Sequence, residues 1–240
     1  MSLRPAFGYH RNVRQLGKRH IFRTVLLCAA GLVIAFYAVC IVELVALRWI
    51  NPPSTAVQAQ RRVQAWLHHR PYRKQYAFVP LSRISPDLPH AVIAAEDGRF
   101  YQHHGIDWQE VQKVVDQDLD QGRLVRGGST ITQQLIKNLF LTTSRSLVRK
   151  AVEFTLVPAA EHILSKRRIL ELYLNVIEWG PGVYGAEAAS RSWYGIPASR
   201  LNREQAARLA ALIPSPLRRK PARMNSYTAE ILRRMSQMGW

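Results

Sequence analysis

Acidic residues are scarce in this chain of 240 residues, which has 16 Asp and Glu against 34 Lys and Arg. The formal net charge is therefore +18. Such a charge indicates an anionic partner, which can be nucleic acid, a membrane surface or a phosphate-bearing substrate. Apolar residues make up 48% of the chain, which excludes a disordered protein. The position of the charges along the chain must decide among the three partners.

Cysteine is also scarce, and both copies, Cys28 and Cys40, lie in one apolar segment. They are twelve residues apart, which on a single helix is too far for a disulfide bond. The rest of the chain has no cysteine, so it carries neither a disulfide framework nor a stray thiol. This usage suits a domain that lies in an oxidising compartment.

One long apolar run stands near the N-terminus. Residues 1–23 carry six cations and no acid, and the 18 residues from Val25 to Val42 have no charge. With Glu43 tolerated, a helix of about 23 residues spans roughly 35 Å and crosses a bilayer core of about 30 Å. A cleaved signal peptide has a shorter apolar core. We therefore predict a basic cytoplasmic tail over 1–23 and a transmembrane signal anchor over 24–47, with the remainder outside the cytoplasm.

The part of the chain after the anchor is itself basic, with a net charge of +13. Nucleic acid is disfavoured there by the outward topology, which leaves a membrane surface or a phosphate-bearing substrate. Residues 48–84 are predicted to form a stalk, because Asn51-Pro52-Pro53-Ser54 breaks the helix and polar residues follow. Helical spacing dominates 85–240 and strand-like alternation is rare, which predicts a mostly helical globular domain.

An acidic pair, Glu96 and Asp97, ends a short apolar segment in that domain. Phe100, His103 and Gly105 follow at fixed offsets. A carboxylate in this position is a candidate general base, because partial burial raises its pKa toward working pH. A solvated acidic pair at the end of a helix is the alternative.

A second cluster begins at Gly127 and Gly128, which lead into a predicted helix that Ser129 caps and that ends at Phe140. Free backbone N–H groups at such a helix start form a natural anion site, and Lys137 adds a positive charge. The alternative is an ordinary capped amphipathic helix.

Two further clusters are rich in cations. Arg149 and Glu153 lie one helical turn apart, so they form either a common ion pair or a carboxylate held by phosphate-binding cations. Ser165 is predicted to cap a helix that begins with the cations of 166–168. Cations at a helix N-terminus oppose the helix dipole and therefore need an anionic partner or solvent.

In this order, the clusters resemble the peptidoglycan glycosyltransferase domain (glycosyltransferase family 51), a lysozyme-like family that polymerises lipid II. The resemblance covers residues 80–240. The matching motifs are Glu-Asp-x-x-Phe-x-x-His-x-Gly at 96–105, Gly-x-Ser-Thr-x-x-Gln-Gln at 127–134, Arg-Lys-x-x-Glu at 149–153 and Ile-Leu-Glu-x-Tyr-Leu-Asn at 169–175. The resemblance implies a two-lobed, mostly α-helical domain. Transpeptidase motifs are missing, so we expect the monofunctional, biosynthetic form.

The resemblance also implies roles for single residues. Glu96 is the general base that deprotonates the acceptor sugar, and Glu153 is the second catalytic carboxylate, on the donor side. The remaining implied residues bind substrate: Asp97, Arg99, Ser129, Thr130, Gln133, Gln134, Lys137, Arg149, Lys150 and Lys166. A divalent cation, Mg or Mn, is implied with the substrate diphosphate, although no protein ligand set for a metal is legible in the sequence.

The expected partners are lipid II, the growing lipid-linked strand, the membrane, and proteins of cell-wall synthesis or division. The expected place is the bacterial inner membrane, with the catalytic domain in the periplasm. Two other functions stay open from the residues alone. One is a glycan-cleaving lytic transglycosylase of lysozyme-like fold, and the other is a non-catalytic scaffold of the cell-wall machinery.

Overall fold

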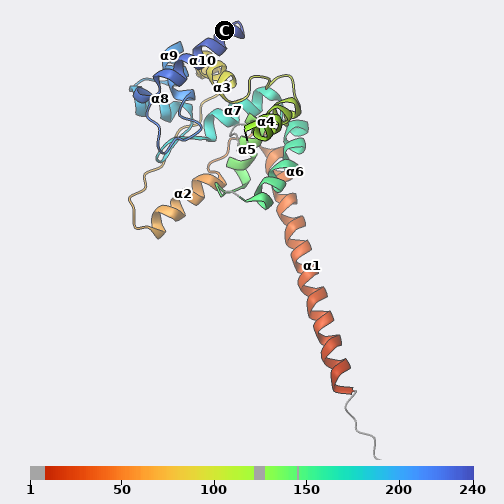
Figure 1. The fold of residues 1–240 in the computed structure, drawn as a ribbon. Helices are drawn as coiled ribbons and strands as arrows, with labels where there is room; N and C mark the ends of the chain where they lie inside the picture. The colour runs from red at the N-terminus through yellow and green to blue at the C-terminus, as the bar shows by residue number, and fades with distance from the viewer. Residues whose placement is uncertain (1–8, 122–127, 145) are drawn as a thin grey trace, which may run out of the picture. The chain divides into compact units, whose positions relative to one another are not determined.

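The computed structural model describes residues 9–121, 128–144 and 146–240, and it divides into a unit over 1–45 and a compact unit over 46–240 (Figure 1). The N-terminal helix α1 runs over Tyr9–Ala46. Its stretch from His20 to Ala46, 27 residues long, is the one helix of the described residues with the length and apolar composition to cross a membrane. The predicted transmembrane anchor thus falls on a helix of suitable length.

The compact unit is mostly helical, as predicted. Its α-helices are α2 (Ala56–Leu67), α3 (Asp87–Glu96), α4 (Trp108–Gln121), α5 (Ile131–Phe140), α6 (Leu147–Ile163), α7 (Lys166–Val176), α8 (Ala186–Tyr194), α9 (Arg203–Ala210) and α10 (Asn225–Gln237). Short 3-10 turns lie at Leu81–Arg83, Ala198–Arg200 and Pro221–Arg223.

A small sheet joins the start of this unit to its middle. Its strands are β1 (Gln75–Tyr76), β2 (Glu178–Gly180) and β3 (Val183–Tyr184), in the order β1-β3-β2. β1 pairs with β3 in parallel and β2 pairs with β3 antiparallel. Gly182 makes the turn at φ +73°, where an added Cβ would lie 2.6 Å from the backbone oxygen of Arg73. Only glycine fits so close an approach.

The helices pack in two groups. α3, α9 and α10 contact one another, and α5 contacts α2, α6 and α7. α5 shows why: Ile131, Leu135, Ile136 and Leu139 recur at helical spacing and are all buried, so one apolar stripe faces its neighbours. The first group carries the end of α3, and the second carries the start of α5, so the predicted motifs approach each other from different groups.

The segment predicted as a stalk, 48–84, lies inside the compact unit. α2 buries Val57 and packs on α5, and Arg61 forms an ion pair of 3.0 Å with the buried Glu178. The hydroxyl of Tyr76 donates to the backbone oxygen of Pro52 at 2.6 Å. In the sequence, the few apolar residues of α2 stand among basic and polar residues, so the segment resembles an exposed linker. Its contacts with residues distant in sequence show that it packs against the rest of the unit.

Helix caps follow the sequence closely. Ser165 caps α7, as predicted. Asn202 caps α9, and Asp107 accepts the Glu110 N–H at the start of α4 at 2.9 Å. The prediction for α5 is wrong by one residue, because Thr130 and not Ser129 is the cap. α6 continues across Pro158 to Ile163.

Candidate active site

A cleft of about 760 Å³ opens in the compact unit. Six of the predicted site residues line it: Glu96, Asp97, Arg99, Ser129, Thr130 and Gln134. The lining also includes residues that the sequence did not single out, namely Pro214, then Tyr227, Arg234 and Gln237 on α10, and Met238 at its C-terminal end. No local signal in the sequence of α10 marks it as a cleft wall, because its position depends on its packing against α3 and α9.

Glu96 is the last residue of α3 and is half-buried at the cleft. Its Oε2 accepts a hydrogen bond of 2.8 Å from Nε2 of Gln134. Burial raises the pKa of Glu96, while the Gln134 hydrogen bond and the charges of Lys137 and Arg219 act in the opposite direction. Among the described residues, Oε1 of Glu96 has no hydrogen-bond partner. A carboxylate with a raised pKa that lines a cleft is suited to accept a proton from a bound hydroxyl.

Gln134 is itself held in one orientation. Its Nε2 donates to Glu96 and, at 3.3 Å, to the backbone oxygen of Ser129, while its Oε1 accepts the hydroxyl of Tyr173 at 2.8 Å. Tyr173 is fully buried on α7, and burial raises its pKa well above the usual value, so it remains a donor. Tyr173 belongs to one of the sequence motifs, but the sequence gave it no role. Its contact with Gln134 arises only when α7 packs against α5.

Asp97 links the two groups of helices. Its Oδ2 accepts the backbone N–H of Ile131 at 3.0 Å, at the start of α5, and its Oδ1 lies 2.8 Å from Nε2 of His103. Nδ1 of His103 accepts the Gly105 N–H at 3.1 Å, so Nε2 carries the proton and donates it to Asp97. Both oxygens of Asp97 therefore have protein partners, and substrate contact by this residue stays a prediction.

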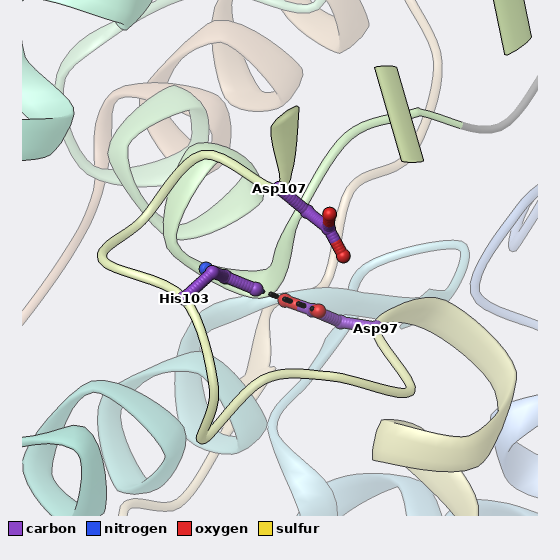
Figure 2. A group of neighbouring side chains, drawn as sticks. All are labelled: Asp97, His103 and Asp107. Carbon is purple, nitrogen blue, oxygen red and sulfur yellow. Dashed lines mark hydrogen bonds and ion pairs between the residues drawn. The ribbon is translucent and has the colours of Figure 1, made fainter. Parts of the chain in front are cut away.

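Asp97, His103 and Asp107 place one ligand atom each within 4.8 Å of one another, which is close enough to hold a metal ion (Figure 2). Their other partners do not fit a cation. Nε of Arg99 donates to Oδ2 of Asp107 at 2.9 Å, and its Nη2 pairs with Oδ1. Burial alone would raise the pKa of Asp107, but the Glu110 N–H and Arg99 hold it below its usual value. Every carboxylate oxygen of the group is thus engaged by an N–H group, and a guanidinium already supplies the positive charge.

The donor-side cluster lies on α6. Glu153 is 2% exposed, its Oε2 accepts Nη1 of Arg149 at 2.6 Å, and its Oε1 pairs with Nζ of Lys150. Nζ of Lys150 also donates to Oγ of Ser129 at 3.1 Å, which joins α6 to the loop before α5. A single carboxylate with these two cations leaves an excess of positive charge beside the cleft residue Ser129.

Lys137 on α5 connects the two carboxylates electrostatically. Burial lowers its pKa, while the charges of Glu153 and Glu96 both raise it. Within the described part of the chain, its Nζ has no hydrogen-bond or ion-pair partner. A half-buried ammonium without a partner costs free energy unless an anion joins it. This favours the predicted role of Lys137 in binding a negatively charged substrate, which stays a prediction.

The remaining predicted residues hold the site together. Thr130 and Gln133 form a capping box, with Gln133 N donating to Thr130 Oγ1 at 3.2 Å and Thr130 N donating to Gln133 Oε1 at 2.9 Å. Gln133 is 1% exposed. Lys166 donates to Glu161 at 2.8 Å and lies 4.5 Å above the ring of Phe100. Substrate contacts by these three residues stay predictions, and the motif residue Gly127 lies outside the described residues.

Known proteins resemble this chain over most of its length. A family model described as Transglycosylase matches residues 61–238. A biosynthetic peptidoglycan transglycosylase of Pseudomonas putida (strain W619) is 46% identical over 208 residues, which cover 85% of this chain and 88% of the relative. The protein of the same name from Nitrosospira multiformis is 48% identical over 174 residues, 72% of this chain and 76% of the relative.

Proposed function

Because this chain belongs to the peptidoglycan transglycosylase family, we propose that it polymerises lipid II into β-1,4-linked glycan strands and releases undecaprenyl diphosphate. The observation that carries the proposal is the arrangement around Lys137. The charges of Glu96, whose pKa burial raises, and of Glu153, which pairs with Arg149 and Lys150, both act on Lys137. Glu96 suits a hydroxyl that must lose a proton, and the cations around Glu153 suit a leaving diphosphate.

The reaction proceeds as a single inverting displacement. Glu96 takes the proton of the 4-hydroxyl of the acceptor GlcNAc, and that oxygen attacks C1 of the MurNAc at the end of the growing strand. The bond from C1 to the phosphate oxygen breaks, and undecaprenyl diphosphate leaves with the bonding electrons. The α linkage becomes β. Lys137, Arg149 and Lys150 stabilise the negative charge that develops on the leaving group.

The proposed site of action is the outer face of the bacterial inner membrane, where a lipid-linked substrate resides. The apolar helix of His20–Ala46 supports a single-pass anchor, and the cations of 1–23 favour a cytoplasmic N-terminus. A divalent cation would reach the site with the substrate diphosphate, since the group of Asp97, His103 and Asp107 does not fit one.

Polymerisation of labelled lipid II by the purified full-length protein tests the proposal. We expect a ladder of glycan products that a muramidase digests, and the same reaction run with and without added divalent cation tests whether the substrate diphosphate needs the cation. The glycan-cleaving alternative predicts the opposite pattern: soluble fragments from finished sacculi and no polymer. The scaffold alternative predicts neither product.

Tyr173→Phe is expected to alter the pH dependence of the reaction. Without the tyrosine hydroxyl, the amide of Gln134 can turn its oxygen toward Glu96, and Glu96 then loses an N–H donor that favours its ionised form. The pKa of Glu96 rises, so the acid limb of the pH–rate profile moves to higher pH and the rate at pH 7 falls by roughly 10-fold.

Tyr184→Phe is the matched control. Tyr184 is also fully buried. Its hydroxyl makes hydrogen bonds with Glu178 and Tyr72 and has no contact with Gln134 among the described residues. Tyr173→Phe loses one hydrogen bond and Tyr184→Phe loses two, each worth about 1 kcal/mol of stability. Equal acid limbs for the two variants would show that Tyr173 only stabilises the fold.

A further inference from the structure

A second cavity, of about 490 Å³, lies in the compact unit among α8, α9 and α10, which stand together in Figure 1. Its lining includes Trp193 and Tyr194 at the end of α8, Arg208 on α9 and Asn225 at the start of α10. None of the residues that line this cavity lines the cleft of Glu96. The cavity is therefore a separate feature that the proposed reaction does not use.

Helix α10 separates the cavity from the cleft. Asn225 lines the cavity, whereas Tyr227 and Arg234 line the cleft. Successive residues of an α-helix are rotated by about 100°, so Asn225 and Tyr227 lie on nearly opposite faces of α10. Tyr227 and Arg234 are seven residues apart and share one face. A molecule in the cavity would thus leave the cleft open to substrate.

Trp193 gives the cavity a fixed apolar surface. Its Nε1 donates to the backbone oxygen of Trp179 at 3.3 Å. A Cβ added at Gly180 would lie 3.2 Å from the Trp193 ring, so the glycine lets the indole lie close to β2. A fixed indole offers a large, flat apolar surface, which the C–H face of a sugar ring can cover.

Arg208 arranges the polar side of the cavity. Its Nη1 donates to Oδ1 of Asn225 at 2.8 Å and to the backbone oxygen of Pro221 at 3.0 Å. The amide oxygen of Asn225 is thereby engaged, while its Nδ2 has no hydrogen-bond partner among the described residues. Asn225 therefore offers N–H donors from an amide whose orientation is already set.

Tyr194 adds a second unpaired donor. Its hydroxyl is buried and has no hydrogen-bond partner within the described part of the chain. Burial raises the pKa of Tyr194 to about 12, so the hydroxyl keeps its proton at neutral pH. A buried hydroxyl without a partner costs free energy, which an acceptor on a ligand would offset.

The charge around the cavity is positive. The described residues that line it include cations and no Asp or Glu. Residues 205–229 contain five Lys and Arg and no acid. Glu204 pairs with Arg208 at 2.9 Å but does not line the cavity. The surroundings of the cavity therefore favour an anionic ligand.

We propose that this cavity binds an N-acetylated saccharide that carries a carboxylate. The sugar ring covers Trp193, its polar oxygens accept from Asn225 and Tyr194, and the carboxylate lies among the cations. This binding rests on the proposed function, because a glycan strand with anionic peptides is the product that the proposed reaction makes. The cavity would hold a finished unit of such a strand beside the cleft that extends it.

Calorimetric titration of the full-length protein with a muropeptide tests the binding. The probe is the GlcNAc–MurNAc disaccharide with its stem peptide, cut from purified sacculi by a muramidase. N,N′-diacetylchitobiose, which lacks the carboxylates, and the free stem peptide, which lacks the sugars, are titrated separately. We expect each of these to bind at least about 10-fold more weakly than the muropeptide, because each lacks one half of the recognised chemistry.

Asn225→Asp is the variant that tests the site itself. The aspartate keeps an oxygen for Arg208 but replaces the N–H donors by a negative charge, so muropeptide binding should weaken by about 10-fold or more. Ser226→Asp is the matched control, because it adds the same charge at an exposed neighbouring position outside the cavity lining. It should weaken binding by less than about 3-fold, since a solvent-exposed charge is screened. Tyr194→Phe, with an expected weakening of roughly 3- to 10-fold, repeats the test in case Asn225→Asp does not fold.

Equal losses in Asn225→Asp and Ser226→Asp would show general charge attraction and overturn the site. Muropeptide binding that neither Asn225→Asp nor Tyr194→Phe weakens would place the ligand elsewhere and overturn it as well. Lipid II polymerisation by the wild type is measured in parallel. Polymer without muropeptide binding would overturn the cavity site and leave the proposed function intact. Muropeptide binding that Asn225→Asp weakens, without polymer, would support the cavity site and overturn the proposed function.

Discussion

Glu96→Gln is expected to reduce lipid II polymerisation by ~10² to 10⁴-fold, because a glutamine amide cannot accept the proton of the attacking hydroxyl. The shape of the site is retained, since the amide oxygen of the new side chain can still accept the hydrogen bond from Gln134. Glu204→Gln is the matched control: Glu204 pairs on the surface with Arg208 of the same helix, and its loss leaves the rate unchanged. A rate within about 3-fold of wild type for Glu96→Gln would favour the scaffold alternative.

The same variant should not lose stability at neutral pH. Burial raises the pKa of Glu96 above its ordinary value of 4.5, so the protonated side chain is the form that the fold prefers. That contribution to stability is present at low pH and is lost as the pH rises through the raised pKa. The glutamine side chain is neutral at every pH and carries no such loss, so at pH 7 we expect Glu96→Gln to melt at the same or a higher temperature than the wild type. Below pH 4.5 the two proteins should converge.

Lys137→Met should have the second large effect, a fall in kcat/KM of roughly 10² to 10³-fold, because a preorganised charge in a buried site is removed from the transition state. The methionine fills most of the space of the lysine stem. Lys220→Met, on an exposed surface position, is the control and should leave the rate unchanged. If Lys137→Met had normal kinetics and a much lower melting temperature, Lys137 would stabilise the fold and would not act on the substrate.

The stability of the Lys137 variant also has a predicted sign. Burial lowers the pKa of Lys137, so the ammonium is disfavoured in the folded chain. At pH 7 the wild type carries that cost and Lys137→Met does not, so the variant should melt at the same or a higher temperature. As the pH rises through the lowered pKa, the wild type loses the charge and the difference should shrink. Thermal melts between pH 7 and 10 measure this.

Glu96 and Lys137 thus share a property that most charged residues of the chain lack. In each, burial opposes the ionised form and shifts the pKa toward neutrality. Arg208 and Glu204, by contrast, pair on the surface at little cost or benefit. A charged side chain that lowers the stability of the fold is typical of a site that binds a ligand or a transition state, because folding alone would not favour it there.

The sequence by itself determined the features that depend on nearby residues. Helical periodicity predicted the mostly helical fold, the long uncharged run predicted the apolar helix, and Ser165 marked the start of α7. The order of the motifs predicted the transglycosylase family, which the family match and the relatives confirm. These features could be read because caps, amphipathic faces and motifs are set within a few turns of chain.

The tertiary structure alone decided which of these residues meet. Thr130 rather than Ser129 caps α5, and its hydroxyl also donates to the oxygen of Gly105, 25 residues earlier. Tyr173 orients Gln134 although the two residues are 39 positions apart in the sequence. α10 contributes residues to the cleft, and no sequence motif predicted this. Such contacts depend on how separate helices pack, because burial and partner geometry arise only when distant apolar faces come together. The same packing brings the half-buried Lys137 under the influence of the charges of both Glu96 and Glu153.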